Sequence, residues 1–280
     1  MANYHMEIKP ISRGKGQSVT RIINYISGER LYDSYSGNTY YRQRTDVLYH
    51  NIFLPPNAPS DYHNLQYLCN EIEAAEKRYD ARTGRIFIGS LPNELSLNDW
   101  CSIVKEFVEC NFVNYGLCSI VAIHEGRNEA EPSRNNPHVH IIVPTRAVES
   151  DGFSQMKDRE HDKRKYINIW REHWAHVQNM AYERNRFDIR VSHESLEVQG
   201  IFCRKPTHHL NYRDWQEKIR YERAPIEKQN HRIKIHDKEC YHNRQLELDG
   251  ECSRNRQPEL DKEYSRNRQL KWNKKLSRSL

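Results

Sequence analysis

Four stretches of the chain repeat apolar residues at the spacing of an amphipathic helix. They are residues 17–27, 65–75, 100–107 and 167–181. In the first stretch, the apolar side consists of Val19, Ile22, Ile23 and Ile26. Gly28 follows directly, and glycine is the residue that most often ends a helix. Each stretch is therefore predicted to be a helix that packs one side against a core.

Short runs rich in β-forming residues lie between these helices, and Gly, Pro or Asn bounds each of them. They are residues 3–9, 85–91, 117–123 and 138–143. The last two are predicted to be strands joined by a polar loop, which is long for a hairpin. Because helices and strands alternate along the chain, the fold class is expected to mix α and β elements.

The pattern changes near residue 210, where few apolar residues remain and a 12-residue repeat begins at Cys240, Cys252 and Tyr264. The chain has 280 residues and a net charge of +6, and the whole excess lies in residues 211–280. We predict a domain at 1–210 and a basic tail at 211–280 that is helical or disordered. A basic tail suits an anionic partner such as nucleic acid, although such tails also serve solubility alone.

Composition narrows the remaining classes of protein. No apolar run reaches the roughly 18 residues that a membrane-spanning helix needs, so no membrane insertion is expected. The first six residues lack the layout of a secretory signal, which favours the cytoplasm. The seven cysteines include no Cys-x-x-Cys pair, and we expect reduced thiols rather than a zinc ribbon.

The clearest chemical motif is a pair of alternating histidines in the predicted strand at 138–143. In a strand, residues i and i+2 share a face, so His138 and His140 should point the same way, with Val139 on the opposite face. His124 ends the preceding apolar run and could supply a third imidazole if the two strands are neighbours. Three neutral nitrogens with open positions for a phosphate and water suit a catalytic metal ion. Two histidines in an exposed strand can also be incidental.

The predicted helix at 17–27 has a polar side that contains Ser18, Arg21 and Tyr25. A tyrosine one turn after an arginine can present its hydroxyl to a phosphate while the guanidinium neutralises the anion. In a chain with 17 tyrosines, an ordinary surface tyrosine is the competing interpretation. Glu73 and Glu76, on one edge of the next helix, could orient a metal-bound histidine, or could belong to a solvated face.

Together these segments resemble the MobA/MobL family of plasmid mobilisation relaxases, within the His-hydrophobic-His endonuclease superfamily. The resemblance covers about residues 1–210. Its motifs include 11–13, 18–31, 54–56, 73–78, 91–95, His124, 136–140 and 206–210. Typical members have two alanines before the tyrosine and an arginine after it, whereas Ile23 and Asn24 precede Tyr25 here and Ile26 follows it.

The resemblance implies an α+β fold with a central antiparallel sheet flanked by helices and followed by the basic C-terminal extension. It implies a metal-dependent DNA nickase and strand transferase that cuts single-stranded DNA at an origin of transfer to start conjugative mobilisation. Tyr25 would form a 5′-phosphotyrosine, and His124, His138 and His140 would hold Mg²⁺ or Mn²⁺. Glu76 would support catalysis, while the expected phosphate-binding residues are Arg13, Ser18 and Arg21. Relaxosome accessory proteins and a coupling protein would be its partners.

Three other functions remain open on the sequence. A histidine-triad nucleotide hydrolase would need another histidine where Ile142 stands, which counts against it. A rolling-circle replication initiator shares the relaxase chemistry. A DNA-binding protein without catalysis would use the basic tail alone.

Overall fold

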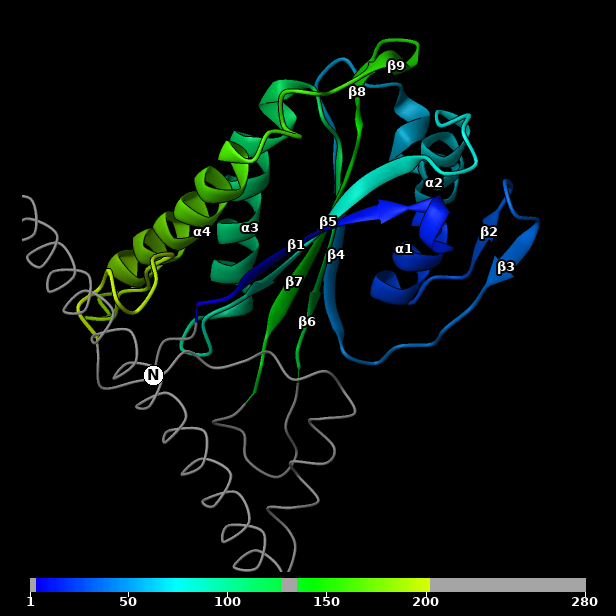
Figure 1. The fold of residues 1–280 in the computed structure, drawn as a ribbon. Coiled ribbons are helices and arrows are strands. Elements are labelled where there is room, and N and C mark those ends of the chain that lie inside the picture. Colours follow the sequence, from blue (N-terminus) through cyan, green and yellow to red (C-terminus); the bar gives the residue numbers. More distant parts are fainter. Residues whose placement is uncertain (1–3, 127–134, 202–280) are drawn as a thin grey trace, which may run out of the picture. The chain divides into compact units, whose positions relative to one another are not determined.

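A five-stranded antiparallel sheet forms the centre of the computed structural model, which describes residues 4–126 and 135–201 (Figure 1). The strand order is β1-β5-β7-β6-β4. The bounds are Met6–Ser12 for β1, Val47–Phe53 for β4, Arg82–Ser90 for β5, Ser119–His124 for β6 and His138–Pro144 for β7. Two small hairpins accompany it, β2 (Leu31–Asp33) with β3 (Asn38–Tyr40) and β8 (Arg146–Glu149) with β9 (Gly152–Lys157).

Two helices cover each face of the sheet, as Figure 1 shows. Helices α1 (Val19–Ser27) and α2 (Leu65–Ala74) lie on one face. Helices α3 (Leu97–Asn111) and α4 (Lys165–Arg184) lie on the other. Three short 3-10 helices complete the described elements, at Arg13–Lys15, Ser60–His63 and Val113–Tyr115.

Apolar side chains of the central strands point alternately to the two faces of the sheet, so the core has two layers. In β7, Val139 and Ile141 are fully buried against α3 and α4, whereas Ile142 is buried against α1 and α2. In β6, Val121 likewise faces α3 and α4, and Ala122 faces α1 and α2. Since side chains alternate across a sheet, the even-numbered positions of both strands face the first two helices.

Helix α1 begins and ends at two capping residues, Ser18 and Gly28. The Ser18 hydroxyl accepts a hydrogen bond from the Arg21 amide at the N-terminus. Gly28 ends the helix with a φ of +75°, a left-handed conformation that glycine adopts without steric cost. Val19, Ile23 and Ile26 are fully buried, so the predicted apolar side does face the core.

The predicted α+β architecture is confirmed, and each of the four expected helices is present within a few residues of its predicted bounds. Strand β4 and both small hairpins were not predicted from the sequence. Strand β4 sits at the edge of the sheet and mixes exposed and half-buried positions, so its sequence shows no clean period of two.

The predicted tail at 211–280 lies outside the described residues. Among the residues that the structure describes, no helix is both long enough and apolar enough to cross a membrane. All four cysteines in this part of the chain are free thiols, at positions 69, 101, 110 and 118.

Candidate metal centre and active site

Strand pairing brings the three predicted histidines together. Strands β6 and β7 are antiparallel neighbours in which His124 pairs with His138, and Ala122 pairs with His140. All three imidazoles therefore project from the face that carries α1 and α2. The ring centroids lie 5.2 Å apart for His124 and His138, 4.7 Å for His124 and His140, and 5.0 Å for His138 and His140.

Backbone carbonyls fix the tautomers of two of these rings. The Nε2 atom of His124 donates to the carbonyl oxygen of Ile26 at 2.7 Å, and Nδ1 of His138 donates to that of Asn136 at 2.8 Å. A neutral imidazole carries one N–H, so Nδ1 of His124 and Nε2 of His138 keep their lone pairs. A histidine that donates one nitrogen to a carbonyl and offers the other is typical of a metal ligand.

Burial keeps all three imidazoles in the neutral form that binds metals. Loss of solvation lowers the pKa of His124 to about 4, although the bond to Ile26 raises it in part. Burial, followed by the neighbouring histidines, lowers the pKa of His140 to about 2. Burial also lowers the pKa of His138.

The donor set fits a divalent metal ion. One potential ligand atom from each histidine lies within 4.8 Å of the other two. The Nδ1 atoms of His124 and His140 are buried and have no hydrogen-bond partner in the described part of the chain. Buried nitrogens without a partner are costly in a core unless something binds them. Three nitrogen ligands leave coordination positions for a substrate oxygen and water, as in catalytic sites.

Tyr25 lies beside this cluster, because the residue that follows it accepts a hydrogen bond from His124. The Ile26 carbonyl that receives the His124 bond belongs to the last turn of α1. Tyr25 is 41% exposed and lines a cleft. The structure thus brings the predicted nucleophile and the predicted metal ligands to one end of the sheet.

Two arginines that the sequence analysis missed flank Tyr25. The guanidinium carbons of Arg42 and Arg44 lie 4.9 Å and 4.7 Å from the centre of the Tyr25 ring. Arg44 also donates to the Tyr25 carbonyl at 3.1 Å and to Asp46 at 2.8 Å. The Arg44 bond holds the pKa of Asp46 at about 2. Ile26, the residue after the tyrosine, is buried in the core, so it offers no charge to the Tyr25 side chain, whereas Arg42 and Arg44 do.

A cleft of about 530 Å³ opens beside the tyrosine. Arg21, Tyr25 and Arg42 line it, together with Tyr40 and Tyr41 from the end of the β2–β3 hairpin. Cationic and aromatic side chains in one groove are what single-stranded nucleic acid requires, because they contact phosphates and stack on bases. Of the predicted phosphate-binding residues, Arg21 is the one that this cleft contains.

Ser18 and Arg13 occupy other positions. The Ser18 hydroxyl caps α1 and donates to Asp33 at 2.8 Å. Arg13 is buried, and its guanidinium contacts Glu73 with an Nη2 to Oε2 distance of 2.6 Å. It also lies 3.7 Å from the centre of the Tyr35 ring. Both side chains are thus engaged in holding the α1 region together, and the structure does not place them at the tyrosine cleft.

Glu76 is also far from the histidines. Its carboxylate accepts from Thr145 and Arg146 at 2.9 Å each and from Lys157 at 2.8 Å. Burial raises the pKa of Glu76, but these bonds outweigh burial and the net pKa is lowered. Thr145 follows the last residue of β7, whereas His138 begins that strand. At roughly 3.3 Å per residue, the two sites are about 23 Å apart along it. The prediction that Glu76 supports the catalytic site therefore does not match its placement.

Two histidines alternate on β7, a third lies on the neighbouring antiparallel strand β6, and helix α1 on the same face of the sheet carries a tyrosine. This arrangement defines the His-hydrophobic-His class of fold and site. Within that class, the sequence matches the model of the MobA/MobL family over residues 17–220, so the chain belongs to this family. The predicted membership of a family of plasmid mobilisation relaxases is thereby confirmed.

Individual relatives agree with this family. The chain is 29% identical to the mobilization protein MobL of Acidithiobacillus ferridurans, over 75% of this chain and 62% of that protein. It is 26% identical to a probable mobilization protein MobA of Bifidobacterium longum, over 76% of this chain and 44% of that one. The chain therefore spans less than two thirds of either relative.

A solved structure from work on vancomycin resistance transfer in Staphylococcus aureus has the same fold. It aligns with a TM-score of 0.63 and 30% identity, and covers 69% of this chain and all of its own.

Proposed function

We propose that this chain is a relaxase that nicks single-stranded DNA at an origin of transfer and starts conjugative mobilisation. The observation that carries the proposal is the 2.7 Å hydrogen bond from His124 to the Ile26 carbonyl, because Tyr25 is the residue before Ile26 in the last turn of α1. Family membership supports the same conclusion, since its relatives are named for mobilization and conjugal transfer.

In the proposed reaction, the Tyr25 hydroxyl oxygen attacks the scissile phosphorus. A bond forms between that oxygen and phosphorus, and the bond from phosphorus to the 3′ oxygen breaks. The products are a 5′-phosphotyrosine and a free 3′ hydroxyl. Because the tyrosine is 41% exposed, its proton can pass to water. The covalent bond retains the energy of the phosphodiester, so a 3′ hydroxyl can reverse the reaction and reseal the strand.

The side chains around Tyr25 have separate tasks in this proposal. Arg21 and Arg42, which share its cleft, would neutralise the phosphates on either side of the cut. Arg44, held by Asp46, would fix the ring. A divalent ion, Mg²⁺ or Mn²⁺, bound by the three histidines would polarise the phosphate and stabilise negative charge in the transition state.

A rolling-circle replication initiator would use the same chemistry, and the family match favours mobilisation over it. The nucleotide hydrolase is disfavoured by position, since Ile142 is buried beneath α1 and α2 instead of extending the histidine row. Accessory proteins of a relaxosome and a coupling protein are proposed partners by analogy with the family.

The test uses single-stranded origin DNA from the element that carries this gene, incubated with the full chain and Mn²⁺. The wild-type chain should form a DNA adduct that survives SDS, and Tyr25→Phe should form none while it still binds DNA. Tyr67→Phe is a matched control because that tyrosine is 43% exposed on the neighbouring helix α2. An unchanged adduct in Tyr25→Phe would move the nucleophile elsewhere, and no adduct in any variant would favour a binder without catalysis.

A further inference from the structure

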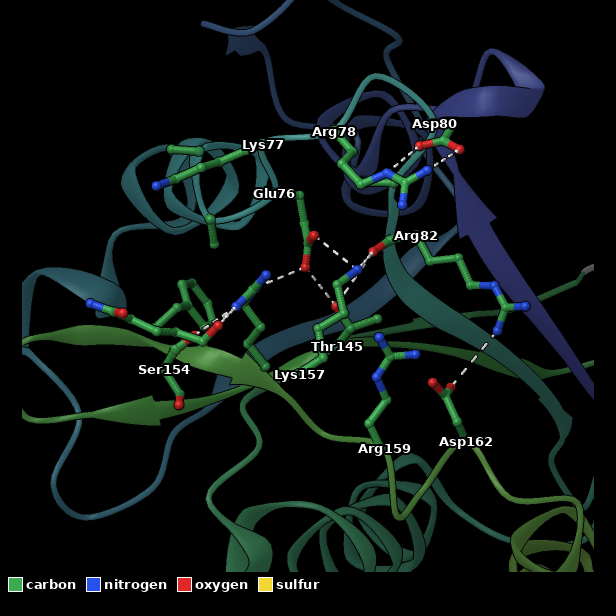
Figure 2. A pocket seen from close by; sticks show the side chains of 16 residues that line it. Glu76, Lys77, Arg78, Asp80, Arg82, Thr145, Ser154, Lys157, Arg159 and Asp162 are labelled. Carbon is green, nitrogen blue, oxygen red and sulfur yellow. Dashed lines mark hydrogen bonds and ion pairs between the residues drawn. The ribbon is translucent and has the colours of Figure 1, made fainter.

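A second basic surface lies at the end of the sheet remote from the histidines. It is a hollow of about 690 Å³ bordered by the end of α2, the start of β5 and the β8–β9 hairpin (Figure 2). We call it the basic pocket. Its six cationic side chains are Lys77, Arg78, Arg82, Arg146, Lys157 and Arg159. They outnumber the three carboxylates of the same lining, so the basic pocket carries a formal charge of +3.

Two of those carboxylates are already paired with cations. Glu76 is held by Arg146 and Lys157, with N to O distances of 2.9 Å and 2.8 Å. Asp162 accepts a bond of 2.6 Å from Arg85, which lies outside the lining, and forms an ion pair with Arg82 at 3.9 Å. The Glu76 carboxylate is buried and accepts from three donors, so it has no capacity left for a further cation. The remaining positive charges of the basic pocket are therefore not neutralised from within.

Lys77 and Arg159 are the cations that these pairings leave over. The third carboxylate, Asp80, is taken by Arg78 at 3.0 Å. Neither Lys77 nor Arg159 forms a hydrogen bond or ion pair with another residue in the described ranges, and Figure 2 draws no dashed line to either. Both side chains are exposed, so they are available to an anion from outside.

An exposed tyrosine lies between two lining residues in the sequence. Tyr79, between two lining residues, is 81% exposed, which is the largest exposure among the large hydrophobic side chains in the described part of the chain. Unpaired cations beside an exposed aromatic ring match a single-stranded nucleic acid, since phosphates meet the cations and a base stacks on the ring. A free phosphate or an acidic peptide would make no use of the ring.

We propose that the basic pocket binds the backbone of single-stranded nucleic acid through Lys77 and Arg159, with a base stacked on Tyr79. The basic pocket lies about 23 Å along β7 from the histidines, so it would hold the strand several nucleotides from the cut. The inference rests on the proposed function only for the identity of that strand. It concerns binding, which can be measured without cleavage.

The experiment measures binding of a labelled mixed-sequence 30-nucleotide DNA strand to the full chain in EDTA across a salt series. The double variant Lys77→Ala/Arg159→Ala should reduce the steepness of log K against log [salt] by roughly 1.4, about 0.7 for each phosphate that the variant no longer neutralises. Lys105→Ala/Arg184→Ala is the matched control, because it removes the same charge from exposed positions of α3 and α4 and should keep the wild-type steepness.

Tyr79→Ala should weaken binding roughly five-fold or more at constant salt, because a base can no longer stack at this position. Tyr115→Ala, at a tyrosine that is 60% exposed beyond α3, should leave binding unchanged. Unlabelled DNA should displace the labelled strand far better than polyglutamate of equal charge or inorganic phosphate. Equal displacement by polyglutamate would point to an acidic protein and overturn the proposal.

The same double substitution is also made in a Tyr25→Phe chain, where the decrease in steepness should be equal. If the chain never forms an adduct and the double variant still shows the decrease in the salt slope, the proposed nicking is wrong, whereas DNA binding at the basic pocket is supported. If the double variant keeps the wild-type salt slope while the chain forms adducts, the proposal that the basic pocket binds DNA is wrong, whereas the proposed nicking site is supported.

Discussion

The two ends of strand β7 use ionisable groups in opposite ways. At its start, His138 and His140 join His124 in a cluster with buried nitrogens that no described residue satisfies. Just past its end, the carboxylate of Glu76 is satisfied by three donors. A cluster with unused lone pairs can bind something else, whereas a saturated one holds the fold together. Hydrogen-bond satisfaction, rather than residue type, therefore separates the candidate catalytic site from the structural one.

The largest expected effect is at the histidine end. His140→Ala removes a ligand, so metal affinity and nicking should fall by more than the roughly 10–100-fold that loss of an outer partner costs. The Nδ1 atom of His140 has no hydrogen-bond partner among the described residues, so the substitution breaks no protein hydrogen bond of that atom. Mn²⁺ titration and adduct yield are the measurements, and His63→Ala, at an exposed histidine, is the control. Normal metal titration in His140→Ala would remove this residue from the site.

The second effect is at the other end. Glu76→Gln leaves Arg146 and Lys157 facing a neutral amide, and breaking a buried ion pair costs about 3 kcal/mol. Denaturant unfolding should show that decrease in stability, whereas Asp61→Asn, at an exposed position, should not. A Glu76→Gln chain that is as stable as wild type but has lost nicking would return this carboxylate to catalysis.

A third prediction concerns pH. The folded state lowers the pKa of His124 to about 4 and of His140 to about 2, from an ordinary value of 6.5. The unfolded chain therefore binds protons that the folded chain does not, so this contribution is full above pH 6.5 and is lost as pH falls, toward 4 for His124 and toward 2 for His140. The melting temperature of metal-free protein should drop across that window, and His140→Ala should flatten the drop. Equal pH profiles for the two chains would contradict the burial argument.

The smallest expected effect is at Arg44. Arg44→Lys keeps the positive charge but removes the planar guanidinium group that donates both to Asp46 and to the Tyr25 carbonyl. We expect the rate of adduct formation to fall roughly ten-fold, with DNA affinity nearly unchanged. Single-turnover kinetics separates the two quantities, and a parallel loss of affinity would show that Arg44 binds DNA instead of positioning the tyrosine.

The sequence could predict the histidine cluster because a period of two in strands is a local property. His138 and His140 share a face by alternation alone, and pairing of consecutive strands added His124. Arg42 and Arg44 could not be found in this way. They follow a small hairpin without a clean pattern and reach Tyr25 only through tertiary contacts. A charge near a nucleophile has no period along the chain that would reveal it.

Arg13 and Glu76 show the converse error. Both belong to motifs of the family, and a charged residue in a motif invites a catalytic role. Their partners, Glu73 for Arg13 and Arg146 for Glu76, are 60 and 70 residues away along the chain. Burial and pairing at that separation depend on how the helices pack, which the spacing of residues does not encode.

The most direct test identifies the residue to which the DNA becomes covalently attached. The adduct formed with Mn²⁺ is digested with trypsin after nuclease treatment, and the modified peptide is sequenced by mass spectrometry. We expect a nucleotide attached through its 5′ phosphate to Tyr25, in the peptide of residues 22–30 that Arg21 and Arg30 delimit. A nucleotide on any other tyrosine, with Tyr25 unmodified, would contradict it.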